Sequence, residues 1–443
     1  MAGGTWIDQN KVRPGVYINY KSAPASLSTM GERGVVAIAR VLDWGERGKM
    51  YIIENPSDCV QFNHSITDDE MLFVRQILLG SNRTQGATKI LLWSLSTTGG
   101  ANASATIEDT TATAKYPGAF GNRISFDIEY TDENTPFTIN TYLDGVMVDS
   151  QTADDWNDVH ENDYVTFSGD VTAGGVQKSL TGGANGTPTS TAYSDFLSAL
   201  ELQKFDVVIY DGAEAVTKTA FADFVKRLSN QEGAKCQAVM SDAGSPDNEC
   251  IINVYPQAVT LADGSTLAAS ELTWWVGGAT AGANVFDSLT YAAYPDAVSI
   301  NPILTSSQQE AAINAGKFAL ISQFDKIQVL TDINSFTTFS VEKGKAFRKN
   351  RVIRTIFGLC NDIYRTFALY YIGAVHNDEE GRKALKAEIL DLMNRYQGNR
   401  ALQNVEAEDV TVLKGVDSDA VVIEIYCQPV DSIEKIYINI TIS

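Results

Sequence analysis

The chain has 443 residues and a formal net charge of −21, with 34 Lys and Arg against 55 Asp and Glu. This length predicts about three domains. The acidity argues against a nucleic-acid-binding protein, which needs a basic surface. No apolar run reaches the roughly 18 residues that a membrane-spanning helix needs. Residues 1–10 lack the basic and apolar regions of a secretory signal, which predicts a protein made and kept in the cytoplasm.

The charge is unevenly distributed along the chain. Residues 343–365 hold seven basic residues and a single acid, Asp362, which gives this segment a net charge of +6. Subtracting that charge from −21 leaves −27 for the rest of the chain. One short positive segment therefore stands in an otherwise strongly acidic protein.

The first predicted element is a β-strand over residues 12–20. Its apolar side chains alternate with a period of two, which is the spacing of a strand. Pro14 lacks an amide donor, so the strand fits the edge of a sheet. We predict an N-terminal arm, residues 1–24, whose strand carries Val12, Val16, Tyr17, Ile18 and Tyr20.

Residues 25–97 are predicted to form the first part of an α/β domain. Gly34–Arg40 and Lys89–Leu95 are compact apolar runs of strand length. Between them, Thr67 and Glu70 have the spacing of a capping box, and Gly80 predicts the end of the helix that this box would begin. Strand, helix and strand in this order are typical of an α/β layer.

Residues 98–188 have a different composition and are predicted to form an inserted small β domain. They are rich in Thr, Ser, Ala, Gly and Asp, and short alternating runs recur without a convincing helix. The pair Asp144-Gly145 between two such runs is a strong hairpin signal. With 14 acids and three bases the segment carries −11, which suits a solvent-facing position.

Residues 189–341 are predicted to continue the α/β domain in three layers, because strands and helices again alternate. The predicted helices lie near Tyr193–Leu200, 214–231, 266–281 and from Ser307 to Gly316, where Ser307 and Glu310 suggest a cap. The predicted strands are Phe205–Tyr210, Cys236–Met240, Val298–Ile303, Phe318–Ile321 and Lys326–Leu330.

The last hundred residues are predicted to form an α+β C-terminal domain, 342–430, followed by a C-terminal strand arm, 431–443. Two long helices, Lys343–Val375 and Glu379–Tyr396, precede two strands, Val410–Leu413 and Val421–Cys427. The closing stretch from Ile433 alternates strictly, and one face of it carries Ile436, Ile438, Ile440 and Ile442.

Motifs of catalysis are absent from the sequence. It contains no P-loop, no Gly-x-Gly-x-x-Gly after a strand and no Gly-x-Ser-x-Gly elbow. Its three histidines, His64, His160 and His376, are far apart, and the acids at 154, 155 and 158 fit a solvated loop better than a cation site. We therefore predict no catalytic, metal or cofactor site, although an α/β enzyme with an added β domain stays open as an alternative.

The two predicted terminal strands are the main positive signal. An unpaired apolar strand at a chain end is normally a liability, and it is tolerated when another copy supplies the missing pairing. A head-to-tail contact of this kind builds rings or helical filaments. The alternative, that both ends pair within their own subunit, is equally compatible with the pattern.

The basic segment is the second signal. Lys343, Lys345, Arg348, Lys349, Arg351 and Arg354 are predicted to form one positive helical face. A positive stripe on an acidic protein favours docking to an acidic protein surface. A solvated helix face is the plainer alternative, and nucleic acid would be repelled by the rest of the chain.

The sequence resembles the tail sheath family of contractile phages and of R-type, phage-tail-like bacteriocins of the Gram-positive type. Arg13-Pro-Gly-Val-Tyr17 resembles the family's entry motif, and Asp431–Thr441 resembles its closing strand. Gly344–Tyr371 and Asn394–Leu402 resemble the C-terminal sheath domain. The resemblance covers the whole chain in the order of its parts, with the inserted β domain as the family's variable region.

The resemblance implies a structural subunit that polymerises helically around a tail tube and contracts to drive the tube through a cell envelope. It implies that the two arms join a neighbour's sheet and that the basic helix faces the tube. The implied partners are other copies in stacked hexameric rings, the tube protein, and baseplate and tail-terminator proteins, without nucleic acid, cofactor or membrane insertion. The particle would assemble in the host cytoplasm and leave by lysis. A type VI secretion-like sheath or another filament component is the alternative within this class.

Overall fold

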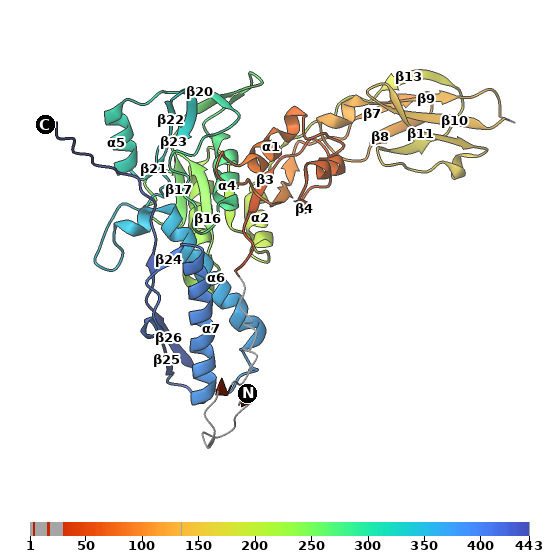
Figure 1. The fold of residues 1–443 in the computed structure, drawn as a ribbon. Coiled ribbons are helices and arrows are strands. Elements are labelled where there is room, and N and C mark those ends of the chain that lie inside the picture. The colour runs from red at the N-terminus through yellow and green to blue at the C-terminus, as the bar shows by residue number, and fades with distance from the viewer. Residues whose placement is uncertain (1–2, 5–15, 18–29, 134, 443) are drawn as a thin grey trace. The chain divides into compact units, whose positions relative to one another are not determined.

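The computed structural model describes residues 3–4, 16–17, 30–133 and 135–442. The larger of its two compact units contains a seven-stranded sheet in the order β21-β17-β16-β15-β3-β5-β4, of which Figure 1 labels β21, β17, β16, β3 and β4. All neighbours are parallel except β4, which runs antiparallel to β5. The strands are β3 (Val35–Arg40), β4 (Lys49–Ile53), β5 (Lys89–Ser94), β15 (Val207–Tyr210), β16 (Gln237–Ser241), β17 (Ile251–Val254) and β21 (Lys317–Phe318).

Helices cover both faces of this sheet because its strands are apolar on both sides. One face packs on α1 (Leu72–Leu79) and α4 (Leu272–Gly282), and the other packs on α2 (Ala192–Leu200), α3 (Ala215–Arg227) and the first turns of α6 (Asn350–Tyr370). Alternate residues of β15 serve the two cores, with Val207 on the first face and Val208 on the second. Continuous apolar runs of this kind are typical of parallel strands buried on both faces.

Helix α4 lies unusually close to its neighbours. It is buried along its length, and a Cβ on Gly278 would lie 2.0 Å from the carbonyl oxygen of Ile77 in α1. A side chain on Gly277 would meet Ile209 of β15 at 2.4 Å. The two glycines therefore let one helix press against another helix and the sheet at once.

Shorter elements follow the sheet in the chain. β18 (Ala258–Leu261), β19 (Thr266–Leu267) and β20 (Ala297–Asn301) form an antiparallel sheet, and β22 (Leu320–Gln323) pairs with β23 (Lys326–Val329) as a hairpin. Helix α5 spans Ser306–Asn314. The helix predicted over 266–281 begins only at Leu272, because residues 266–267 pair as a strand with β18.

Two predicted helix caps are wrong. Helix α1 begins at Leu72 after a 3-10 turn, and the hydroxyl of Thr67 donates to Ser65 Oγ at 2.9 Å instead of capping the helix. Helix α5 is capped by Thr305, whose Oγ1 accepts from the amide of Gln308 in a capping box, two residues before the predicted cap.

The stretch predicted as a small β domain forms two sheets around one core. Their orders are β11-β10-β9-β13 and β12-β8-β7, and the apolar cluster between them includes Phe126 and Ile139. Asp144 and Gly145 have φ values of 50° and 81° and connect β10 to β11, which confirms the hairpin. The strands of these two sheets are β7 (Ser104–Ile107), β8 (Thr110–Ala114), β9 (Ile124–Glu129), β10 (Phe137–Leu143), β11 (Val146–Ala153), β12 (Val165–Gly169) and β13 (Gly175–Ser179). Where the chain enters and leaves this domain, β6 (Thr97–Thr98) pairs with β14 (Thr187–Pro188).

A separate compact unit consists of residues 1–31 and 362–428, so far as they are described. Helix α7 (Glu379–Gly398) buries Leu385, Ile389, Leu392 and Met393 and packs on β25 (Val410–Lys414), which pairs with β26 (Val421–Ile425). Strands β24 (Leu402–Gln403) and β27 (Gln428–Pro429) form a second pair. The mixed α/β character and the β domain of the predicted fold class are thus confirmed.

The helix predicted over Lys343–Val375 is shorter than expected. A 3-10 turn spans Lys345–Arg348, and the α-helix begins at Asn350. Lys349 between them is extended, with φ −83° and ψ 120°, because it forms a β-bridge with Ile333. None of the helices that the structure describes is both long and apolar enough to cross a membrane.

Candidate functional site

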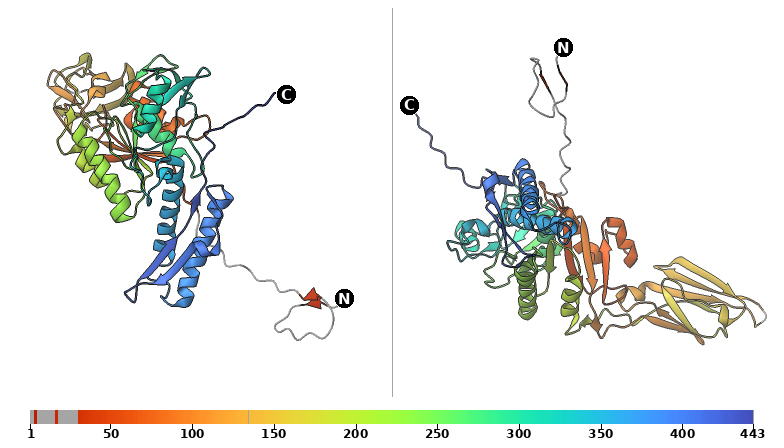
Figure 2. Two further views of the ribbon diagram at one scale, coloured as in Figure 1. Left: turned by 90° about the vertical axis from the view of Figure 1, so that its left-hand side faces the viewer. Right: turned by 90° about the horizontal axis from the view of Figure 1, so that it is seen from below.

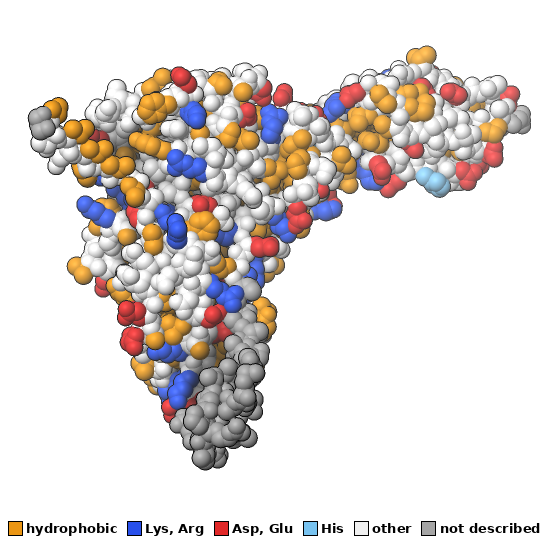
Figure 3. Space-filling model, viewed as in Figure 1, with side chains coloured by type: hydrophobic (Ala, Val, Ile, Leu, Met, Phe, Trp, Pro, Cys, Tyr) orange, Lys and Arg blue, Asp and Glu red, His pale blue; other side chains and the backbone are white. Residues whose placement is uncertain are grey.

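The C-terminal segment has no strand partner among the described residues of its own chain. Residues 430–442 belong to no strand, although the alternation predicts one from Ile433 onward. Ile436, Ile438, Ile440 and Ile442 are 76%, 74%, 83% and 92% exposed. Figures 1 and 2 show this segment running away from the sheet domain, and Figure 3 shows hydrophobic side chains along it. Four largely exposed isoleucines at period two form an unsatisfied strand face.

The N-terminal prediction falls mostly outside the described residues. Val12, Ile18 and Tyr20 lie outside them. Residues Val16–Tyr17 form β2, which pairs in parallel with β1 (Gly3–Gly4). The role predicted for this arm therefore stays a prediction.

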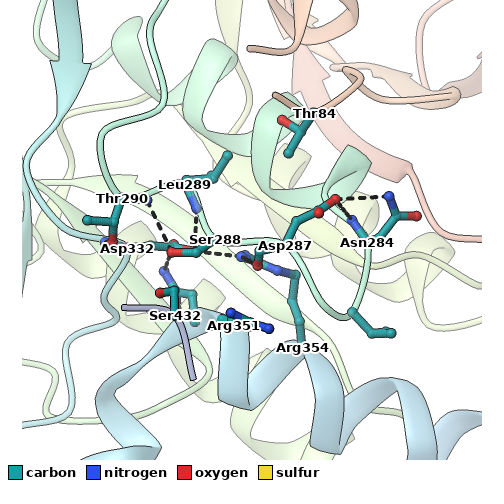
Figure 4. A network of polar contacts seen from close by, with 12 residues as sticks. Thr84, Asn284, Asp287, Ser288, Leu289, Thr290, Asp332, Arg351, Arg354 and Ser432 are labelled. Carbon is teal, nitrogen blue, oxygen red and sulfur yellow. Dashed lines mark hydrogen bonds and ion pairs between the residues drawn. The ribbon is translucent and has the colours of Figure 1, made fainter. Parts of the chain in front are cut away.

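Arg354 is not a surface residue, which corrects its place in the predicted basic face. It is 1% exposed, and its Nη2 lies 2.5 Å from Asp332 Oδ2 and 3.0 Å from the carbonyl oxygen of Asp287. The amide of Leu289 also donates to Asp332 Oδ2, at 3.0 Å. Figure 4 shows Asp332 and Arg354 facing each other between α6 and the loop that carries Asp287. The arginine fixes the start of α6 to the sheet domain.

Two further predicted basic residues are engaged inside their own chain. Lys343 forms an ion pair with Glu249, and Lys349 forms one with Glu434. Both pairs join residues far apart in the sequence, so helical spacing gives no sign of them. The positive segment is therefore partly neutralised by acids of the same subunit.

The remaining three basic residues lie at or near the surface. Lys345 is exposed, while Arg348 and Arg351 are half-buried. Burial lowers the pKa of both arginines from the usual value, which still leaves them charged near neutral pH. The Nε and Nη2 atoms of Arg348 have no hydrogen-bond partner among the described residues, and its guanidinium lies over the ring of Phe339 at 6.0 Å.

Groups that could hold a metal are not assembled. Among the described residues, no three His, Cys, Asp or Glu side chains form a potential metal site. His64 lies instead between Asp43 and Asp68, with ring nitrogens 3.0 and 3.1 Å from their carboxylates. Burial acts to lower the pKa of His64, but hydrogen bonds and charge from the two acids outweigh it and raise the pKa. These two contacts hold Asp43 and Asp68 to His64. They occupy both ring nitrogens, so neither nitrogen is open to a metal.

Sequence reasoning missed the contacts at the base of the C-terminal segment. Glu434 pairs with Lys349, 85 positions earlier, and accepts a hydrogen bond from Thr290, 144 positions earlier. Its place in the alternating run marks it as an ordinary polar position. Only the tertiary structure brings these groups together.

Three family models match the chain in sequence order. Residues 98–185 match the phage tail sheath protein beta-sandwich domain, residues 186–335 the phage tail sheath protein central domain, and residues 342–443 the phage tail sheath C-terminal domain. The β domain, the sheet domain and the C-terminal region thus each resemble the corresponding part of one family.

Known proteins resemble the chain over its full length. It is 32% identical over 479 aligned positions to the phage-like element PBSX protein XkdK of Bacillus subtilis, with all of both chains covered. A crystal structure of the sheath tail protein of Desulfitobacterium hafniense is 40% identical, with a TM-score of 0.85 over 96% of this chain and 99% of that one. The contracted helical sheath of the anti-feeding prophage shares the fold, at 15% identity and a TM-score of 0.58 over 97% and 99%.

Proposed function

Because the chain belongs to the phage tail sheath family, we propose that its copies polymerise helically around a tail tube and contract to drive the tube through a target envelope. The resemblance predicted from the sequence is confirmed, and the protein is a structural sheath subunit of a phage tail or prophage-derived particle and not an enzyme.

The observation that carries this proposal is the unpaired isoleucine face of the C-terminal segment. An extended segment with one apolar face gains main-chain hydrogen bonds and burial by adding to a neighbour's sheet. Full burial of four isoleucines, at roughly 1.5–3 kcal/mol each, would stabilise a contact by about 6–12 kcal/mol before ordering costs. The donor and acceptor surfaces differ, so the contact repeats head to tail and generates either a closed ring or a helix.

The N-terminal arm is proposed to act in the same way. Residues 12–20 carry the Arg-Pro-Gly-Val-Tyr motif and the alternation of a strand. With an arm at each end, every subunit would connect to more than one neighbour, and the lattice would stay linked while subunits rotate during contraction. The division into arm, sheet domain, inserted β domain and inner C-terminal domain is part of this proposal.

The tube is proposed to contact the surface of Lys345, Arg348 and Arg351. Lys345 is exposed and Arg348 and Arg351 are half-buried, which supports an acidic surface of the tube protein as their counterpart. Lys343, Lys349 and Arg354 are engaged by Glu249, Glu434 and Asp332 of the same chain. The proposed tube contact therefore does not rest on Lys343, Lys349 or Arg354, and baseplate and terminator proteins complete the proposed partners.

The test is substitution on the isoleucine face. Ile438→Ser combined with Ile440→Ser should abolish hollow tubes in negative-stain images of concentrated protein, because the donated strand loses its buried face. Asn439→Ser combined with Thr441→Ser changes the opposite face of the same segment and should leave tubes intact. Unchanged tubes from the isoleucine variant would show that this face does not join subunits.

A further inference from the structure

The exposure of the C-terminal segment changes abruptly at one residue. Ser432 and Glu434 are half-buried, whereas every described residue from Lys435 to Ile442 is exposed. Within the described residues, no hydrogen bond or ion pair joins residues 435–442 to the rest of the chain. Glu434 is thus the last residue at which the segment is attached to the described part of its own subunit.

Both carboxylate oxygens of Glu434 are engaged. Oε2 forms the ion pair with Lys349 Nζ, and Oε1 accepts from Thr290 Oγ1 at 2.8 Å and from Ser432 Oγ at 3.4 Å. The side chains of Lys349 and Glu434 are only 23% and 15% exposed. A pair so protected from water is screened less than a surface ion pair.

The groups that hold Glu434 are themselves rigidly placed. Thr290 Oγ1 also accepts from the amide of Asp332 at 2.9 Å, so one hydroxyl connects Glu434 to the buried Asp332–Arg354 pair. The amide of Asn350, at the start of α6, donates to the carbonyl oxygen of Asp332 at 3.1 Å. Lys349 is held in its β-bridge with Ile333. The anchor therefore stands on the sheet domain and the first turn of α6.

We propose that Lys349 and Glu434 are positioning residues that fix the root of the C-terminal arm and thereby set the register in which its isoleucines enter a neighbour's sheet. A slip of one residue would turn every isoleucine to the wrong face of that sheet. From Glu434 the eight residues 435–442 reach at most about 29 Å when extended. A fixed root thus restricts both the direction and the register of the arm. The part that concerns the neighbour rests on the proposed function, whereas the anchor itself does not.

Lys349 thus holds the C-terminal arm, whereas its place in the basic segment predicted a contact with the tube. A lysine that holds its own arm has its charge satisfied before any tube is present. Reversing its charge would act on the arm and not on tube docking. The two roles are separable because only the anchor requires Glu434.

The anchor is tested by cleavage of the unassembled full-length chain, at a concentration below that of assembly. Chymotrypsin cleaves after Tyr437, three residues beyond the anchor, and mass spectrometry detects loss of residues 438–443. Proteases need a locally extended, freely moving segment, so a fixed root slows cleavage. Glu434→Gln, which keeps the size of the side chain and removes its charge, should raise the cleavage rate about tenfold, the scale of a charge-assisted hydrogen bond.

Charge exchange supplies the decisive comparison. Lys349→Glu alone should also speed cleavage, and the double variant Lys349→Glu with Glu434→Lys should return it to within about twofold of the native rate, because the opposite charges are restored. Lys345→Glu makes the same charge change four residues away and should leave cleavage after Tyr437 at the native rate. Native-rate cleavage of Glu434→Gln, or no recovery in the double variant, would overturn the anchor.

Assembly of the same variants separates the anchor from the proposed function. In pelleting assays, Glu434→Gln should raise the protein concentration needed for tubes about tenfold, and the double variant should restore it. Faster cleavage with unchanged assembly would confirm the anchor and overturn its role in setting the register. Absence of tubes from the native chain as well would contradict the proposed function while the cleavage result still stands.

Discussion

The central strands and the C-terminal segment are both rich in branched apolar residues, but these residues are buried in the central strands and exposed in the C-terminal segment. β15 reads Val-Val-Ile-Tyr and is buried on both faces. The segment from Ile436 alternates isoleucine with Tyr437, Asn439 and Thr441 and is exposed throughout. A continuous run specifies a strand covered on both sides, whereas alternation specifies one apolar face. The terminal pattern therefore needs one sheet surface to cover it, which the described part of its own subunit does not provide.

The two regions also differ in what their side chains contribute to the stability of the single chain. The sheet domain has a closed core and a buried ion pair, so its interactions stabilise the subunit itself. The arm beyond Glu434 contributes to stability only after another copy covers it. Three changes test this contrast by the free energy of unfolding, from the largest effect to the smallest.

Asp332→Ala should cause the largest loss, about 3–5 kcal/mol in the free energy of unfolding, because it leaves Arg354 buried and unpaired. Urea denaturation measures the change. Asp419→Ala, at an exposed position, is the control and should change stability by less than about 0.5 kcal/mol. A loss of under 1 kcal/mol from Asp332→Ala, within about the scatter of surface variants, would mean that the pair does not hold α6 to the sheet domain.

His64→Gln should have an intermediate effect, about 1–3 kcal/mol, because hydrogen bonds to two carboxylates are weakened. The pKa of His64 is raised in the folded chain, so its charged form contributes stability that is fully present below the unfolded pKa of about 6.5. That contribution is lost as the pH rises through the folded pKa.

The difference between native and His64→Gln urea midpoints should therefore shrink as the pH is raised from 6 to 9, a range chosen to span roughly the ordinary pKa of histidine. His376→Gln, at an exposed position, is the matched control and should leave the pH dependence of the native chain unchanged. A difference that grows with pH would contradict the assigned direction of the shift.

Removal of residues 436–443 should have the smallest effect on the single chain, less than about 0.5 kcal/mol, because the described residues of this segment are exposed. The same truncation should abolish tube formation in negative-stain images. A marked loss of unfolding free energy would show that the segment packs on its own subunit, and the contrast between the two regions would then fail.

Much of the local structure was predictable because its signals are local. β3, β5, β15 and β16 were predicted within a few residues, and Asp144-Gly145 specified its hairpin through backbone conformations that these residues tolerate. β4 and β17 were missed because Lys49–Ile53 and Ile251–Val254 are short and carry weak periodicity. Their strand form depends on pairing with β5 and β16.

The candidate site was only partly predictable. The isoleucine face was found because alternation is a property of neighbouring residues. The basic face was overestimated because Lys343, Lys349 and Arg354 are paired with acids between 22 and 94 positions away. Helical spacing describes which side chains share a face, but it contains no information on what covers that face.

The sequence alone determined the family, the alternation of the terminal arm and the absence of known catalytic motifs. Each of these features can be recognised from residues that are adjacent or regularly spaced along the chain. Only the tertiary structure decided the order of the sheet, the burial of Arg354 and the attachment of Glu434 to Lys349 and Thr290. Those features arise when distant segments exclude water from the same place, and the strength of a charge pair depends on that exclusion.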